Sequence, residues 1–251
     1  MATYVLVAGN WLGAWAWADV TRHLRGVGHD VHPVTLTGVG SRVHLASAAV
    51  DLGTHISDVV HTMEYEDLRD VILVGHSYGG FPVTGAADRA PDRLSRVVYV
   101  DSGPLPDGTS QLDTAGPEAR DAILARMKDD ADGWREPFPT WAAVEAEGTA
   151  GGLDEAAWTR IAARATDQPL GANAQPLRLT NDARRNTVPH TLLTCVFPLD
   201  QVQAMIAAGH PYFAGFTADQ TWSYAELPTG HWPMFSRPER LAAILDELSR
   251  G

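Results

Sequence analysis

The sequence predicts an α/β domain built on a mostly parallel, doubly wound sheet, with a helical cap inserted into it. Strand-like and helix-like segments alternate over the first hundred residues, and the alternation resumes at His190. The stretch between these two parts carries helical patterns but no convincing strand. We therefore expect a core formed by residues 1–103 and 190–251 and a cap formed by residues 104–189.

The elements of the core follow in order from their patterns. The apolar and β-branched run "TYVLVAG" predicts a buried strand, "WAWADVTRHLRGVG" has helical spacing and closes on glycine, and "HDVHPVTLTG" is extended. Helical "THISDVVHTMEYE", strand "RDVILVG", helical "GGFPVTGAADRAP" and strand "RVVYVD" come next. In the cap, "PEARDAILARMK" and "LDEAAWTRIAARA" predict helices. The last part contains strands in "HTLLTCVF" and "TWSYAEL", a helix in "QVQAMIAAG" and a final helix in "RPERLAAILDELSRG".

Composition excludes several classes of function. With 19 Lys and Arg against 31 Asp and Glu, the formal net charge of −12 argues against nucleic acid or an anionic membrane as a partner. The single Cys195 rules out a disulfide framework and a multi-cysteine metal site, and its apolar surroundings indicate a buried small hydrophobe. The start "MATYVLVAGN" has neither a basic region nor a long apolar run, which favours a cytoplasmic protein. We expect a small-molecule substrate. The sequence is also compatible with a homodimer.

The segment "VILVGHSYGG" predicts a catalytic nucleophile. It places the pattern G-x-S-x-G, from Gly75 to Gly79, directly after a buried strand and before a helix. In this nucleophile elbow the flanking glycines leave room for a strained turn that presents the serine, here Ser77. The backbone N–H of Tyr78 then lies at a helix N-terminus, where it is a candidate donor to an oxyanion. The second candidate donor is the backbone N–H of Asn10, after the first strand, although the Asn10 side chain is equally a candidate helix cap.

The loop "ELPTGHWPMFSRPE" places His231 between the last strand and the last helix. A histidine there can reach back over the elbow and take the proton of Ser77 as a general base. Four other histidines lack this placement and are interpreted as structural: His44, His55, His61 and His76. No metal-binding spacing such as HExxH occurs, so we expect no metal.

Over nearly its whole length the chain resembles the α/β-hydrolase superfamily. It is most similar to a branch of small cofactor-free esterases that includes plant methylesterases, hydroxynitrile lyases and bacterial pyrethroid-hydrolase-like enzymes. The similarity lies in "NWLGAWAW", "VTLTGVGSRVHLAS", "GHSYGG" and "GHWPMFSRPE". Two departures matter. Ala8-Gly9 stands where many relatives have His-Gly, and Gly9 and Trp232 stand where the hydroxynitrile lyases carry threonine and lysine, which disfavours cyanohydrin cleavage.

The carboxylate that would orient His231 has two candidates. In most superfamily members it lies at the end of the strand after the cap, but here that place holds Pro198, with Asp200 two residues later. Asp101, in "RVVYVDSGPLP", ends the strand after the elbow helix, and some members use that position. Each has an ordinary alternative role, because Asp101 is a candidate loop cap and Asp200 a candidate cap of the helix that follows it. The role of a helix cap suits Asp200 better than the role of a loop cap suits Asp101. We therefore favour Asp101 as the carboxylate that orients His231.

These residues predict acyl transfer from an ester by a Ser-His-Asp triad, with no cofactor. An apolar pocket would then be lined by aromatic residues, each of which is equally a candidate for packing the cap on the core: Trp11, Phe81, Trp134, Phe138, Trp141 and Trp158. Such a lining in an acidic protein suits a small, uncharged, moderately hydrophobic ester. The alternatives are a lyase or cyclase of secondary metabolism that uses the same serine and histidine, and a catalytically silent ligand-binding protein.

Overall fold

A six-stranded, fully parallel sheet forms the centre of the protein, so the predicted α/β-hydrolase-type fold is confirmed. The computed structural model describes residues 1–129, 132–210, 213–216 and 221–250. The strands occur in the order β2-β1-β3-β4-β7-β8. Their bounds are β1 (Thr3–Val7), β2 (Asp30–Val34), β3 (Val71–His76), β4 (Leu94–Val100), β7 (His190–Thr194) and β8 (Trp222–Glu226).

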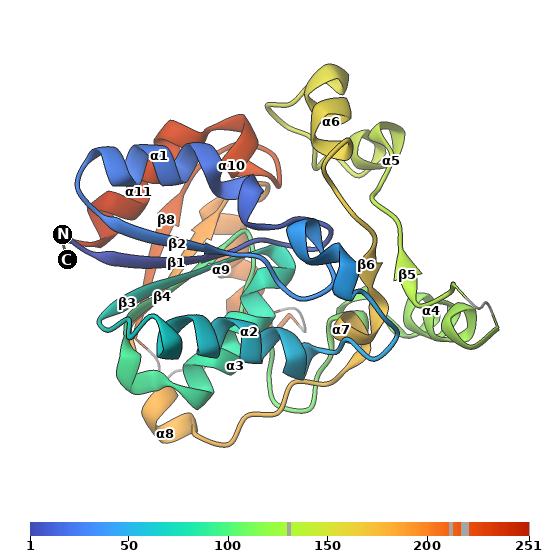
Figure 1. Ribbon diagram of the computed structural model, residues 1–251, viewed down its shortest axis with the longest axis horizontal. Coiled ribbons are helices and arrows are strands. Elements are labelled where there is room, and N and C mark those ends of the chain that lie inside the picture. The colour runs from blue at the N-terminus through green and yellow to red at the C-terminus, as the bar shows by residue number, and fades with distance from the viewer. Residues whose placement is uncertain (130–131, 211–212, 217–220, 251) are drawn as a thin grey trace.

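Helices cover both faces of the sheet (Figure 1). One face carries α1 (Ala18–Gly26), α10 (Pro233–Ser236) and α11 (Pro238–Leu248), and the other carries α2 (Leu52–Tyr65), α3 (Gly80–Arg89) and α8 (Asp182–Arg185). Strand side chains alternate between two apolar layers, because successive residues of a strand point to opposite faces. Val5 and Leu73 pack toward α2 and α3, whereas Leu6 and Val74 pack toward α1 and α11. Strands buried on both faces read as continuous apolar runs, which is why the sequence predicts them well.

The strand order creates a switch point between β1 and β3. From β1 the chain moves to β2 on one side, whereas β3 lies on the other side of β1, and the later strands continue outward from β3. In open parallel sheets, ligands bind outside the carboxyl ends of strands at such a point. The loop after β1 and the turn after β3 both begin there.

The chain between β4 and β7 is rich in helices and is called the helical region below. It contains a 3₁₀-helix η5 (Gln111–Ala115), α4 (Pro117–Asp129), α5 (Trp141–Ala146), α6 (Glu155–Ala162) and α7 (Leu170–Ala174), followed by α8. It also contains two strands, β5 (Arg135–Glu136) and β6 (Gln168–Pro169), which pair in antiparallel fashion. The sequence predicts no strand in this region, and this prediction is wrong, because two residues are too few to show an alternating pattern.

The remaining helices are short or lie at the edge of the sheet. α9 (Leu199–Ala207) follows β7, and further 3₁₀-helices are η1 (Ala14–Trp17), η2 (Gly40–Leu45), η3 (Ser77–Gly79) and η4 (Pro91–Arg93). The two chain termini lie close together at one end of the sheet, away from the helical region (Figure 1). Among the helices in the described part of the chain, none is both long enough and apolar enough to cross a membrane.

Candidate active site

Ser77 lies one residue past the end of β3 in a strained turn. Its φ is +52°, in the left-handed region that L residues rarely adopt. The turn requires glycine on both sides. A Cβ on Gly75 would lie 2.5 Å from the Gly79 carbonyl oxygen, and a Cβ on Gly79 would lie 2.6 Å from that of Val7. The elbow therefore has the geometry that the G-x-S-x-G pattern predicts, with Ser77 at the switch point.

His231, in the loop between β8 and α10, contacts both Ser77 and Asp101. Its Nε2 is 2.8 Å from the Ser77 Oγ, and its Nδ1 is 2.6 Å from the Asp101 Oδ2. A carboxylate only accepts hydrogen bonds, so we assign the proton of the neutral imidazole to Nδ1. Nε2 is then the acceptor that faces the Ser77 hydroxyl. The loop is held by the His231 backbone N–H, which donates to the Thr149 carbonyl at 2.8 Å.

Asp101 follows β4 directly, with its side chain only 13% exposed. Its Oδ1 accepts from the backbone N–H groups of Cys195 at 3.0 Å and Val196 at 3.2 Å, just past the end of β7. Burial alone would raise the pKa of Asp101, but the hydrogen bond and charge of His231 and these two N–H groups hold its pKa below the usual value. The group is thus an ionised carboxylate with a fixed orientation.

Asp200, the other candidate acid, lies in the first turn of α9 and is exposed. Its Oδ1 accepts from the neighbouring Gln201 N–H at 2.8 Å. Pro198, which stands in the place where most members of the superfamily have the acid, is the residue directly before α9. The structure places Asp101, and not Asp200, against His231.

His76, inside the elbow motif, holds the backbone of the loop that contains His231. It is fully buried, and its Nε2 donates to the His231 carbonyl oxygen at 2.6 Å. Burial, together with the charge of His231, lowers the pKa of His76 to about 3, so the ring is neutral and its proton is on Nε2. The sequence analysis interpreted His76 only as structural. In the sequence, its position directly before Ser77 is the signal that could have indicated a role in holding the active site.

Ser102 is a second contact that the sequence analysis missed. It is 2% exposed, and its Oγ donates to the Ser77 carbonyl oxygen at 2.6 Å. This bond ties the strained turn after β3 to the end of β4. A Cβ on Gly80 would lie 2.1 Å from the Ser102 Oγ, so the glycine that follows the motif makes the contact possible. In the sequence, only the position directly after Asp101 could have pointed to it.

The two residues predicted to supply the oxyanion donors lie in segments next to Ser77. The loop after β1 passes beside the nucleophile, since a Cβ on Gly9 would lie 2.9 Å from the Ser77 Cβ. Asn10 comes next, and Tyr78 is the second residue of the 3₁₀-helix η3, which begins at Ser77. The Asn10 side chain is 7% exposed, and its Nδ2 donates to the Gln111 Oε1 at 3.4 Å. It does not cap the 3₁₀-helix η1 that follows, which has no side-chain cap.

Four of the six predicted pocket residues form an aromatic cluster next to His231. Phe138 stacks on Trp158 with ring centroids 4.7 Å apart, and Trp158 meets Trp232 edge-on at 4.6 Å. Because Trp232 follows His231 directly, the cluster reaches the loop of the predicted base. Trp11 joins it through Phe138, and Trp141 joins it through Trp158.

The other two predicted pocket residues lie elsewhere. Phe81 is 4% exposed and packs against the Tyr78 ring in the layer between the sheet, α2 and α3. The guanidinium of Arg135 lies over the Trp134 ring, 4.3 Å from the ring centroid. Neither residue belongs to the aromatic cluster.

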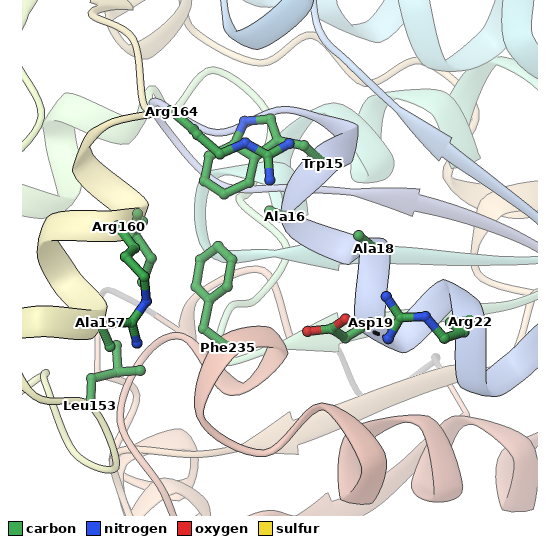
Figure 2. Close-up of a pocket in the computed structure, with 11 residues that line it drawn as sticks. Trp15, Ala16, Ala18, Asp19, Arg22, Leu153, Ala157, Arg160, Arg164 and Phe235 are labelled. Atoms are coloured by element: carbon green, nitrogen blue, oxygen red, sulfur yellow. Dashed lines mark hydrogen bonds and ion pairs between the residues drawn. The ribbon is translucent and has the colours of Figure 1, made fainter.

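A separate pocket of about 530 Å³ lies where α6 faces η1, α1 and α10 (Figure 2). Trp15 and Phe235 stack at one side of it with centroids 5.6 Å apart, and the Arg164 guanidinium lies over Trp15. None of the predicted site residues lines this pocket. Among the described residues there is also no group of three or more His, Cys, Asp or Glu side chains arranged to hold a metal ion.

Comparison with known proteins points to one family. The model of the "Alpha/beta hydrolase family" matches residues 4–244. A carbendazim hydrolyzing esterase of Nocardioides sp. (strain SG-4G) is 34% identical over 267 residues, covering 99% of this chain and 100% of the esterase. Methylesterase 9 of Arabidopsis thaliana is 38% identical over 113 residues, 44% of this chain and 43% of its own length.

Solved structures show the same fold. An extracellular alpha/beta-hydrolase from a Paenibacillus species superposes with a TM-score of 0.79 at 22% identity, covering 98% of each chain. A pyrethroid hydrolase superposes with a TM-score of 0.73 at 19% identity, covering 100% of this chain and 98% of its own.

Proposed function

Because this chain belongs to the alpha/beta hydrolase family and is a hydrolase of the esterase type, we propose that it is a serine esterase with a Ser77-His231-Asp101 triad. Its substrates are carboxylic esters of small, uncharged, moderately hydrophobic molecules. The observation that carries the proposal is the chain of two hydrogen bonds, 2.8 Å from Ser77 Oγ to His231 Nε2 and 2.6 Å from His231 Nδ1 to Asp101 Oδ2. Both lie within the reach that proton transfer requires.

In the acylation step, the Ser77 Oγ bonds to the ester carbonyl carbon while its proton passes to the His231 Nε2. The carbonyl oxygen becomes an oxyanion. When the tetrahedral intermediate collapses, the bond to the alkoxy group breaks, and His231 returns the proton to the departing alcohol. Water then repeats the sequence: it gives a proton to His231 and its oxygen to the acyl carbon, and Ser77 regains its proton as the acid leaves.

Asp101 makes this proton transfer possible in two ways. It holds the imidazole in the tautomer with the proton on Nδ1, and its negative charge stabilises the imidazolium that forms. Its own orientation is set by the N–H groups of Cys195 and Val196. Buried with a lowered pKa, it keeps its charge at neutral pH.

The oxyanion is assigned to the backbone N–H groups of Asn10 and Tyr78. The loop of Asn10 passes beside Ser77, and the N–H of Tyr78 lies in the first turn of the helical segment formed by η3 and α3, whose dipole favours negative charge. Donors fixed before the reaction need no reorganisation when charge develops, and one such donor contributes on the order of 10²-fold to 10³-fold in kcat.

The choice of an uncharged, apolar ester rests on the surroundings of His231. The aromatic cluster of Phe138, Trp158 and Trp232 lies against its loop, and the formal net charge of −12 disfavours anionic ligands. The esterase that is similar over the full length hydrolyses carbendazim, and the structural neighbours include a pyrethroid hydrolase. These relatives support an uncharged, apolar ester as the substrate of this protein.

Hydrolysis of p-nitrophenyl butyrate by the wild-type protein and by Ser77→Ala tests the proposal. We expect turnover by the wild type and loss of at least about 10³-fold in kcat for the variant, as for nucleophile removal in other triads. Activity that survives Ser77→Ala would exclude Ser77 as the nucleophile. A folded wild type with no turnover of a panel of esters would favour the lyase or cyclase alternative.

A further inference from the structure

Trp11, the residue after the proposed oxyanion donor Asn10, has a strained backbone. Its φ is +66°, in the left-handed region, although it is a bulky residue with a Cβ. Such conformations persist only where the surroundings hold them, and they gather at functional sites. Contacts from neighbouring segments must therefore hold this loop in its conformation.

The region between β4 and β7 supplies partners for all three polar groups of Trp11. The Gln168 Oε1 accepts from the Trp11 backbone N–H at 3.1 Å, and the Thr166 N–H donates to the Trp11 carbonyl at 3.1 Å. The indole Nε1 donates to the Glu136 carbonyl at 2.9 Å. These contacts span more than a hundred residues of sequence and come from β5, β6 and the residues just before β6.

Gln168 is itself rigidly placed. It is 1% exposed, its backbone pairs with Glu136 across β5 and β6, and its Nε2 donates to the Asn173 Oδ1 at 3.5 Å. Among the described residues, two side chains of this region bond Trp11: that of Gln168 and that of Thr166, whose hydroxyl donates to the Trp11 carbonyl at 3.4 Å. Because the Thr166 N–H donates to that same carbonyl, only a substitution at Gln168 leaves a polar group of Trp11 without its partner.

We propose that Gln168 is a positioning residue that holds the oxyanion loop in its working conformation, an inference that rests on the proposed function. The loop runs beside the nucleophile, so a displacement of Trp11 moves the Asn10 N–H relative to the carbon that Ser77 attacks. Oxyanion donors act only within a narrow range of distance, and a misplacement of about 1 Å can cost on the order of 10²-fold in rate. The helical region thus takes part in catalysis by supporting the loop, beyond any role in substrate choice.

The test compares variants matched in size. Gln168→Met keeps the length of the side chain but offers no comparable acceptor. Gln168→Glu keeps an acceptor oxygen toward Trp11, and its other oxygen accepts from Asn173 once that amide turns its NH₂ toward it. Gln175→Met is the control, because Gln175 also ties this region to the core but bonds Gly53 N at 2.6 Å and Asp51 Oδ2 at 2.8 Å instead of the oxyanion loop. The concentration of sites in each preparation is counted by fluorophosphonate labelling carried to completion.

We expect kcat per labelled site on p-nitrophenyl butyrate to fall about tenfold or more in Gln168→Met with little change in KM, since the lost support acts on transition-state binding. Gln168→Glu should recover most of this loss, and Gln175→Met should stay within about twofold of the wild type, as expected for a site away from the loop. A trifluoromethyl ketone, whose adduct with Ser77 carries an oxyanion, should bind Gln168→Met more weakly by a similar factor. A purely structural role would lower the number of labelled sites without changing the inhibition constant of those that remain.

The inference is overturned if Gln168→Met keeps its kcat per labelled site and its inhibitor affinity, if Gln168→Glu recovers nothing, or if Gln175→Met loses as much. These results leave the proposed function standing when the wild type is active and Ser77→Ala is not. A wild type that neither turns over p-nitrophenyl butyrate nor reacts with the fluorophosphonate would instead refute the proposed function, and this inference with it.

Discussion

Replacing Asp101 by asparagine should disable the proposed base without disturbing its position. Asn has nearly the same shape, but its two ends differ: one is an acceptor oxygen and the other a donor NH₂. The N–H groups of Cys195 and Val196, which now donate to Oδ1 at 3.0 and 3.2 Å, require the amide oxygen on their side. The NH₂ then faces the Nδ1 of His231 and forces its proton onto Nε2, which can no longer accept from Ser77.

This wrong tautomer sets the size of the effect. The same change in a serine protease lowers kcat about 10⁴-fold, which corresponds to about 5 kcal/mol of transition-state stabilisation. We expect Asp101→Asn to lower kcat on p-nitrophenyl butyrate by at least about 10³-fold, with thermal unfolding near that of the wild type. Asp200→Asn is the matched control. Asp200 is exposed and bonds only the adjacent Gln201 N–H among the contacts described, so its kcat should stay within about twofold. A larger loss in Asp200→Asn, or a loss below tenfold in Asp101→Asn, would show that Asp101 is not the acid that orients His231.

Two further predictions concern stability. Burial lowers the pKa of His76 to about 3 and that of His190 to about 4, below the unfolded value of 6.5. Between these values the unfolded chain binds protons that the native protein does not, so the free energy of unfolding should fall as pH drops from 6.5 toward 4, by about 1.4 kcal/mol per pH unit for each proton. Urea unfolding at several pH values measures this slope, and a flat profile would contradict it. Arg185→Met should lower the free energy of unfolding by about 3–5 kcal/mol, because it leaves the buried Asp88 carboxylate without its ion pair. Arg184→Met breaks only an exposed pair and should cost less than about 1 kcal/mol, and equal losses in the two variants would refute the assignment.

The sequence predicts well what a short stretch of chain encodes. Buried parallel strands appear as apolar runs, and the elbow of Ser77 appears as glycines at fixed spacing between a strand and a helix. His231 could be assigned because its loop follows the last strand. The antiparallel pair of β5 and β6 could not be predicted, since each strand has only two residues and is defined by a partner more than 30 residues away.

The missed residues act through contacts between distant segments. His76 bonds the backbone of His231 across 155 residues, and Gln168 bonds Trp11 across 157 residues. A pattern within one segment carries no information on such pairs. The sequence favoured Asp101 over Asp200 but left Asp200 as an alternative for the same reason. Both follow a strand, and only the packing of β4 against β7 determines which carboxylate lies beside the histidine.

The proposed mechanism depends on Ser77 forming the covalent acyl intermediate. Peptide mass spectrometry of the wild-type protein after reaction with a fluorophosphonate identifies the reactive residue, with Ser77→Ala as control. We expect a single adduct on the peptide that contains Ser77 and none in the variant, because only this hydroxyl is within hydrogen-bond reach of the His231 Nε2 among the residues described. No adduct on a folded wild-type protein, or an adduct on another residue such as Ser102, would show that Ser77 is not the nucleophile.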